Sequence, residues 1–305
     1  MSTNEITTKH LIVWIISSMI GAIVFCADGN WIGTLIGGSV VSLLVWLSLR
    51  LGDHWNGSVY RIVQCIWLSV VLSQLLGYSA DCWPTGERTF PVVPLSLLTL
   101  ATISAHKGSE CTAKGVCVLF WIMAGLLGIV VISGIPELNL AFLEPRNALV
   151  KPQILFLYLL PSLTGFFKYK IKSVYPFGVL IVFGVCISVW ICGILSQQIA
   201  NVAVWPFYES AKSVQFLNIA KRLESLVSAG VTIGNYALYS LLLCAAGNIG
   251  ERFGKRRAAV NLSSVTAAGF MLLNVKIDDS FLIIASGFLW VFLPLLGAFK
   301  RKVRK

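Results

Sequence analysis

Long apolar runs recur along this chain from near its N-terminus to near its C-terminus. The runs are continuously apolar and do not alternate with polar positions, which favours α-helices over the strands of a membrane barrel. Only helices and closed barrels cross lipid, because each backbone N–H and C=O group must find a partner inside the structure. The runs predict about ten transmembrane helices, at residues 11–26, 31–51, 59–78, 92–105, 115–135, 152–167, 175–196, 224–247, 258–275 and 280–299.

The composition agrees with this interpretation. Of the 305 residues, 57% are hydrophobic and 12% are charged, whereas a soluble domain carries about 25% charged residues. The loops between the predicted helices are short, which leaves no room for a soluble domain or a linker. We therefore expect an all-α integral membrane protein that forms a single polytopic domain in the lipid bilayer over residues 1–305.

The basic residues are unevenly divided between the predicted loops. With ten spans, both termini lie on one side of the membrane, and 17 of the 24 Lys and Arg residues fall on that side, against 7 on the other. Cytoplasmic loops of membrane proteins carry such an excess, so we expect both termini in the cytoplasm. The same rule accounts for the net charge of +11 without a nucleic acid as partner.

No sequence pattern of catalysis is present. The chain lacks the motifs of phosphate-binding loops, hydrolase nucleophiles, zinc proteases and dinucleotide-binding folds. The three His residues lie near loops, and the eight Cys residues lie mostly within apolar runs and form no CxxC pair. Neither a zinc site nor a redox site is indicated. We expect a protein that is not an enzyme and that uses neither a cofactor nor a metal.

Ten spans can form two sets of five. Transporters built in this way often relate the two sets as inverted repeats, with the first helix of each set broken near the middle of the membrane. The sets here would be residues 11–135 and 152–299, and their first helices are both short and interrupted, by Ser17–Gly21 and by Pro161–Gly165. Pro removes a helical hydrogen bond, which favours a break. Alternatively, the glycines of these interruptions allow close packing between helices.

The stretch from Trp205 to Tyr239 organises the rest of the chain. It begins as a polar surface segment and passes into the eighth span. Within that span, Ser228, Thr232, Asn235 and Tyr239 recur every three or four residues and share one face of a helix. A polar face is costly against lipid, which indicates an interior position or a cavity. Hydrogen bonding between helices, without a ligand, explains this stripe equally well.

The same stretch resembles a known family. The run PFYESAKSV, followed shortly afterwards by Arg222-Leu223-Glu224 at the start of a span, resembles the B subunit of spore germinant receptors. This is the endospore germination permease family of the amino acid–polyamine–organocation transporter superfamily. The rest of the chain resembles it more loosely, including PELNL at 136–140 and LEP at 143–145. The third span departs from the family, because it carries Ser73-Gln74 where members often have charged residues.

This resemblance implies a membrane subunit of a receptor that senses an amino acid or a similar small nutrient. It implies assembly with receptor subunits of the A and C types, in the inner membrane of a bacterial spore or in the cell membrane. Backbone N–H groups freed in the two broken helices would hold a carboxylate, and the polar face of the eighth span would line a side-chain pocket. The implied ligand-binding residues are Ser18, Gly21, Ser162, Thr164, Gly165, Thr232, Asn235 and Tyr239.

Three other residues are assigned structural or subunit-coupling roles. Pro161 would hold the break in the sixth span. Arg222 and Glu224 lie where the eighth span enters the bilayer, where a charge costs least. These two residues form a structural pair, a contact to another subunit, or part of a path across the membrane, and the sequence does not choose among the three.

Two other functions fit the same fold. One is an autonomous amino-acid carrier, coupled to sodium or working by exchange. Almost no charge lies in the middle of a span, which argues against proton coupling because proton carriers keep an ionisable relay there. The other is a scaffold whose pocket is vestigial, a function weakly favoured by the short chain and its trimmed loops.

Overall fold

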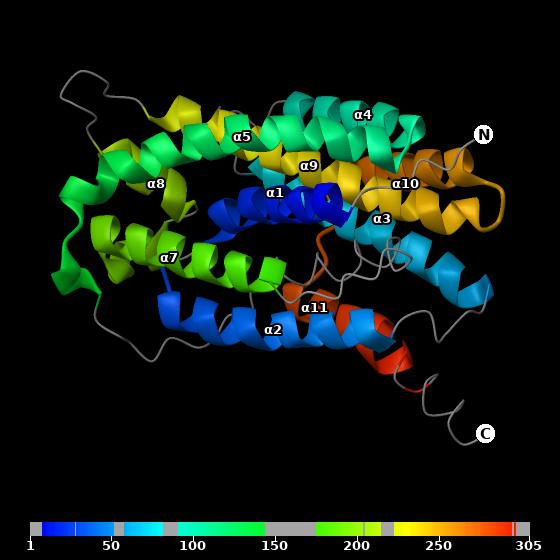
Figure 1. Ribbon diagram of the computed structural model, residues 1–305, viewed down its shortest axis with the longest axis horizontal. Helices are drawn as coiled ribbons and strands as arrows, with labels where there is room; N and C mark the ends of the chain where they lie inside the picture. Colours follow the sequence, from blue (N-terminus) through cyan, green and yellow to red (C-terminus); the bar gives the residue numbers. More distant parts are fainter. Residues whose placement is uncertain are drawn as a thin grey trace.

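A computed structural model describes residues 8–27, 29–51, 58–81, 91–143, 175–203, 205–214, 223–294 and 296. Within these ranges the chain is helical, with short 3-10 and π segments and no strand, which confirms the all-α fold class. The elements in Figure 1 are α1 (Thr8–Cys26), α2 (Trp31–Leu51), α3 (Ser58–Asp81), α4 (Val92–Lys107), α5 (Ser109–Gly134), η1 (Ile135–Glu137), η2 (Leu140–Phe142), α7 (Tyr175–Val202), α8 (Pro206–Ser213), α9 (Glu224–Glu251), α10 (Arg256–Leu272), α11 (Asp279–Gly287) and the π segment η4 (Phe288–Phe292).

Helix α9 forms the centre of the bundle. It packs against α1, α3, α4, α5 and α10 (Figure 1). Its side chains from Ala237 to Ala246 are all at most 1% exposed, so this part of the helix has no face toward the surroundings. A helix that is buried all round belongs to the core of a large bundle. The stretch from Trp205 to Tyr239 thus continues into α9, the central helix of the fold.

Several described helices have the length and composition of membrane spans. Four are long and apolar enough to cross a membrane, and three further apolar helices are shorter. On α5 large apolar side chains point outward, and Trp121 is 75% exposed, as expected of a surface that contacts lipid. The described residues are therefore consistent with a membrane protein. The four long spans are Ser58–Ala80, Ser109–Glu137, Pro176–Ser196 and Ser225–Glu251.

Three of the predicted spans correspond to described helices. The span predicted at 31–51 coincides with α2, and the span predicted at 175–196 ends where α7 kinks, at Ser196 with its φ of 63°. The last predicted span begins as α11 and continues as the π segment. The sixth predicted span, 152–167, lies outside the described residues. The division into two inverted repeats therefore stays a prediction.

Helix α1 corrects one prediction. It runs without a break through Ser17–Gly21, so the expectation of a broken first helix is wrong. The Ser18 hydroxyl donates to the carbonyl of Trp14 in the same helix, at 2.8 Å. A Cβ atom on Gly21 would lie only 2.5 Å from the Cα of Gly234 in α9. Gly21 therefore allows two helices to cross closely, which was the alternative interpretation of this interruption.

The π segment Phe288–Phe292 lies just before Pro294. Because Pro has no N–H group, the carbonyl of Leu289 lacks its donor in the π-helical pattern. The hydroxyl of Tyr60 in α3 donates to this carbonyl at 2.8 Å. The carbonyl that Pro294 leaves without a backbone donor thus accepts a hydrogen bond from a neighbouring helix. This bond joins the start of α3 to the last described helix.

Candidate functional site

Two of the predicted residues of α9 meet one hydroxyl group of α3. The side-chain amide of Asn235 donates to Ser79 Oγ at 3.3 Å, and the Tyr239 hydroxyl lies 2.5 Å from the same oxygen. We call Ser79, Asn235 and Tyr239 the α3–α9 cluster. Thr232, the third predicted residue of this face, bonds instead to the carbonyl of Ser228 within α9, at 2.7 Å.

The hydrogen bonds of Ser79 have a definite direction. Its hydroxyl donates to the carbonyl of Leu75 in the same helix, at 2.9 Å. A hydroxyl has one proton and two acceptor positions. Because that proton goes to Leu75, Ser79 accepts from both Asn235 and Tyr239, and all of its positions are filled. The cluster is therefore a complete small network that joins two helices.

The cluster is buried and neutral. Ser79 is 4% exposed, Asn235 is 6% exposed and Tyr239 is 0% exposed, and the surrounding core is apolar. Neutral hydroxyl and amide groups recognise polar atoms by hydrogen bonding, and these three side chains carry no ionic charge. In a core of low polarity, an unmade hydrogen bond is costly. Any rearrangement of these helices must therefore supply new partners for the same three side chains.

Helix α1 closes a third side of this region. The Trp14 indole donates to the carbonyl of Ala237 in α9, at 3.0 Å. About two turns further along α1, Gly21 contacts the backbone of Gly234, next to Asn235. The structure thus brings the predicted residues Gly21 and Asn235 side by side. Their neighbourhood differs from the predicted one, because the backbone N–H groups of α1 lie within a continuous helix and are not freed for a ligand.

The remaining predicted residues cannot be placed in this site. Glu224 is the first residue of α9. Its predicted partner Arg222 lies outside the described residues, so a pairing between them stays a prediction. The other predicted residues outside the described ranges are Pro161, Ser162, Thr164 and Gly165.

Ser79 was not predicted as a site residue. It lies near the C-terminal end of α3, a helix in which Ser69, Ser73 and Gln74 are also buried. A single Ser in an apolar helix carries no distinct signal, because its hydroxyl usually bonds back to its own helix, as Ser69 does to the carbonyl of Cys65 at 3.0 Å. Only the packing of α3 on α9 distinguishes these two serines.

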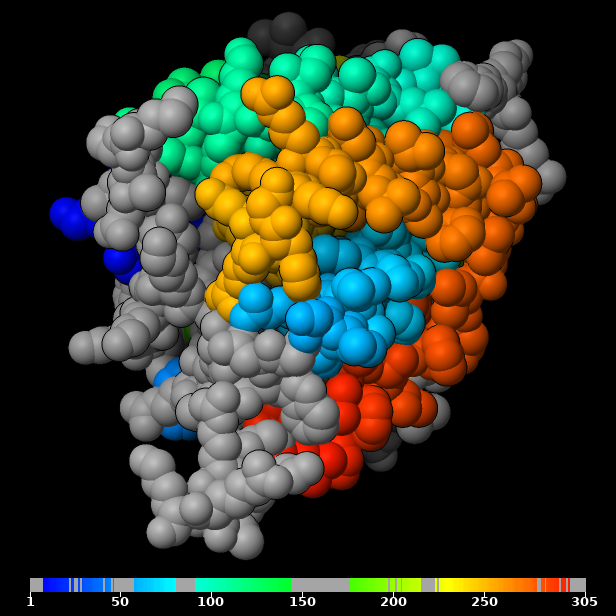
Figure 2. Space-filling view, turned by 90° about the vertical axis from the view of Figure 1, so that its right-hand side faces the viewer, coloured from blue at the N-terminus to red at the C-terminus, as the bar shows by residue number. Residues whose placement is uncertain are grey.

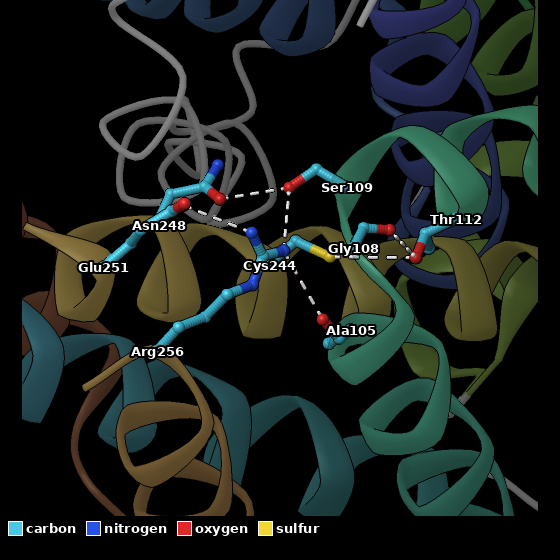
Figure 3. Close-up of polar contacts among 8 residues, drawn as sticks. All are labelled: Ala105, Gly108, Ser109, Thr112, Cys244, Asn248, Glu251 and Arg256. Atoms are coloured by element: carbon cyan, nitrogen blue, oxygen red, sulfur yellow. Dashed lines mark hydrogen bonds and ion pairs between the residues drawn. The ribbon is translucent and has the colours of Figure 1, made fainter. Parts of the chain in front are cut away.

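A second polar cluster lies at the C-terminal end of α9 (Figure 3). Arg256, at the start of α10, donates to the carbonyl of Ala105 at 3.5 Å, to Ser109 Oγ at 3.2 Å and to Glu251 Oε2 at 3.2 Å. Ser109 in turn donates to Asn248 Oδ1 at 3.0 Å. We call these five residues the turn cluster, because they join the α4–α5 turn to the α9–α10 turn.

The turn cluster supports a first prediction. Arg256→Met removes the three side-chain donor contacts but keeps an unbranched apolar stem, so we expect the free energy of unfolding to fall by about 1.5 kcal/mol, the lower end for bonds to charged groups. The side chain is 25% exposed, so water replaces part of what is lost. The midpoint of thermal unfolding in detergent micelles measures the effect. Arg257→Met, at an exposed neighbouring position, is the matched control, and equal midpoints for the two variants would contradict the prediction.

Other chemistry is not assembled within the described residues. Among them, no group of three His, Cys, Asp or Glu side chains could hold a metal ion. The polar groups of the two clusters are hydroxyls, amides, one guanidinium and its carboxylate partner Glu251. These groups bind and orient other molecules or other helices.

A scan against protein-family models and a search of curated proteins give no match for this chain. The fold and the site define a class: an all-helical protein with several helices of membrane-span length and a neutral polar cluster buried among them. Any narrower assignment depends on the residues of the chain itself.

Proposed function

We propose that this chain is the membrane subunit of a spore nutrient-germinant receptor and senses an amino acid or a similar small nutrient. The observation that carries the proposal is the α3–α9 cluster, a neutral hydrogen-bonding site buried in an apolar bundle. Polar groups inside a membrane bundle are costly and usually functional. The resemblance of the segment PFYESAKSV to the family also supports the proposal. Its first eight residues form α8, which packs against α7 and α9.

The proposal includes an orientation and an architecture. The chain forms about ten transmembrane helices in two inverted repeats, with both termini in the cytoplasm. Basic residues gather at the end that carries the turn cluster, where Figure 2 shows the α9–α10 turn between α3 and the helices α4 and α5. An excess of Lys and Arg is expected on the cytoplasmic side. The basic residues of the two turns and of the adjoining helix ends are Lys107, Lys114, Arg252, Lys255, Arg256 and Arg257.

A sensing mechanism follows from the position of α9. At rest, the α3–α9 cluster holds α9 against α3. A nutrient that offers hydrogen-bond partners to Asn235 and Tyr239 replaces Ser79 and releases α9 from α3. Because α9 runs on to the turn cluster, its displacement reaches the cytoplasmic end of the protein. The ligand shifts this equilibrium only by its difference in affinity between the two arrangements.

The receptor assignment is tested by what accompanies the protein. The chain is tagged at its C-terminus in its native host and purified gently from membranes of sporulated cells. We expect two stoichiometric partners, an A-type subunit with large soluble domains and a C-type lipoprotein subunit. Uptake of labelled amino acids is measured in vesicles that contain the purified chain, and we expect none.

Each other result rejects the receptor assignment. A protein that purifies alone from vegetative membranes and takes up amino acids is an autonomous carrier. A protein that purifies alone, without uptake and without stabilisation by any amino acid, is a scaffold.

A further inference from the structure

A cleft opens where α3 and α10 end, away from the turn cluster. It has a volume of about 270 Å³ and is formed by the C-terminal half of α3, the connection between α10 and α11, and the residue before α4. We call it the α3 cleft. The residues that matter for its chemistry are Gln74, Gly77, Tyr78, Asn274, Lys276 and Asp278.

The α3 cleft has a fixed wall. Gln74 is 8% exposed, and its side-chain amide donates to the carbonyl of Val275 at 2.8 Å. Its amide oxygen accepts from the backbone N–H of Ile277 at 3.4 Å. One buried side chain therefore holds two backbone groups of the α10–α11 connection in place. Asn274 has a φ of 52°, a left-handed conformation that Asn tolerates better than most residues, and it turns the chain away from α10.

The rim of the cleft carries one charge of each sign. Lys276 and Asp278 both line it and are exposed. They are two residues apart in the connection between α10 and α11. Because both side chains line the cleft, they border the same space. An ammonium and a carboxylate group side by side complement a molecule that carries the opposite pair of charges.

The rest of the lining suits a small molecule with an apolar part. Met271, Val275 and Ala80 supply apolar surface, and Tyr78 supplies a hydroxyl group. A cavity of about 150 Å³ on this measure holds a benzene molecule, so a volume of about 270 Å³ suits a molecule the size of an amino acid. Gly77 adds to this space, because a Cβ atom there would meet no described atom within 4 Å.

We propose that the α3 cleft binds a small zwitterion, a free amino acid or a molecule with the same pair of charges. Its carboxylate pairs with Lys276 and its ammonium group with Asp278, while its side chain lies against the apolar lining. This inference depends on the cleft alone and not on the receptor assignment. It does, however, place a ligand on α3 directly behind Ser79, whose neighbours Tyr78 and Ala80 both line the cleft.

The test measures thermal stabilisation of the purified full-length protein in detergent micelles. The probes are the twenty free L-amino acids, added singly. For each one that stabilises, its amide and its N-acetyl derivative, which lack one of the two charges, are also added. We expect at least one amino acid to raise the unfolding midpoint, and we expect both of its derivatives to lose the effect.

Three variants locate the binding site. Gly77→Leu fills the cleft from a position with open space, and Gly128→Leu places the same side chain on α5 at a position that is equally open and away from the cleft. We expect Gly77→Leu to abolish stabilisation and Gly128→Leu to keep it. Lys276→Met is expected to weaken the apparent affinity by about tenfold, the loss of one charge-assisted hydrogen bond.

The outcomes separate this inference from the proposed function. Stabilisation that survives in Gly77→Leu, or that none of the amino acids produces, overturns the cleft proposal. Stabilisation that is lost in Tyr239→Phe and kept in Gly77→Leu places the ligand in the α3–α9 cluster, so that the cleft proposal fails and the sensing proposal stands. Stabilisation by the cleft in a protein that purifies without receptor subunits leaves the cleft proposal standing and rejects the receptor.

Discussion

Gly21→Ala is expected to lower the free energy of unfolding by about 1–3 kcal/mol, the usual cost of overpacking. The added methyl carbon would lie 2.5 Å from Gly234 Cα and 2.8 Å from Gly234 C. Both atoms belong to a helix backbone, so no side chain can rotate away. Helix α1 must then move off α9, and the bond from the Trp14 indole to the carbonyl of Ala237 is strained with it.

Gly128→Ala is the matched control for this substitution. Both glycines lie inside helices, but a Cβ atom at 128 meets no described atom within 4 Å. Helix propensity alone favours alanine over glycine by about 1 kcal/mol, so Gly128→Ala should be neutral or stabilising. Unfolding midpoints of both variants in detergent micelles give the comparison. If the two midpoints rise together, α1 and α9 do not cross closely at Gly21.

The hydrophobic pattern was sufficient to predict several of the described helices. The span predicted at 31–51 is α2, and the span predicted to end at residue 196 ends at the kink of α7. Continuous apolar runs set these limits, because charged and turn residues cannot continue into lipid. Packing between helices was not predictable in the same way. From the sequence, Gly21 is equally compatible with a break in α1 and with a close contact between two helices. Only the position of Gly234 on α9 decides between the two interpretations.

The candidate site was half predictable. The spacing of Asn235 and Tyr239 placed them on one face of α9, and the structure brings both to one partner. Thr232 shares that spacing but bonds within its own helix, because a Thr hydroxyl can reach the carbonyl four residues back. Ser79 could not be predicted, since a partner 156 residues away leaves no local pattern.

Ser79→Ala is expected to have the largest effect in the α3–α9 cluster. It removes one oxygen and leaves two buried donors, the Tyr239 hydroxyl and the Asn235 amide, without the acceptor that both now use. Each stranded group costs about 1–3 kcal/mol in a soluble protein, and a hydrogen bond between membrane helices averages about 0.6 kcal/mol. We expect a loss of about 2 kcal/mol, measured by unfolding in detergent micelles. Ser69→Ala is the control, since Ser69 lies in the same helix, is equally buried at 4% exposed and bonds back to Cys65.

A double-mutant cycle makes this prediction specific to the cluster. Tyr239→Phe alone removes one donor and leaves Ser79 bonded to Leu75 and Asn235, so its cost should be about 1 kcal/mol. The double variant has no stranded tyrosine hydroxyl, and its cost should be smaller than the sum of the two single costs. Under the proposed function, Ser79→Ala should also change the amino-acid concentration that triggers the response of intact spores, because the hydrogen bonds that hold α9 against α3 at rest are lost. Additive costs together with an unchanged response would mean that the three side chains neither form a network nor set the position of α9.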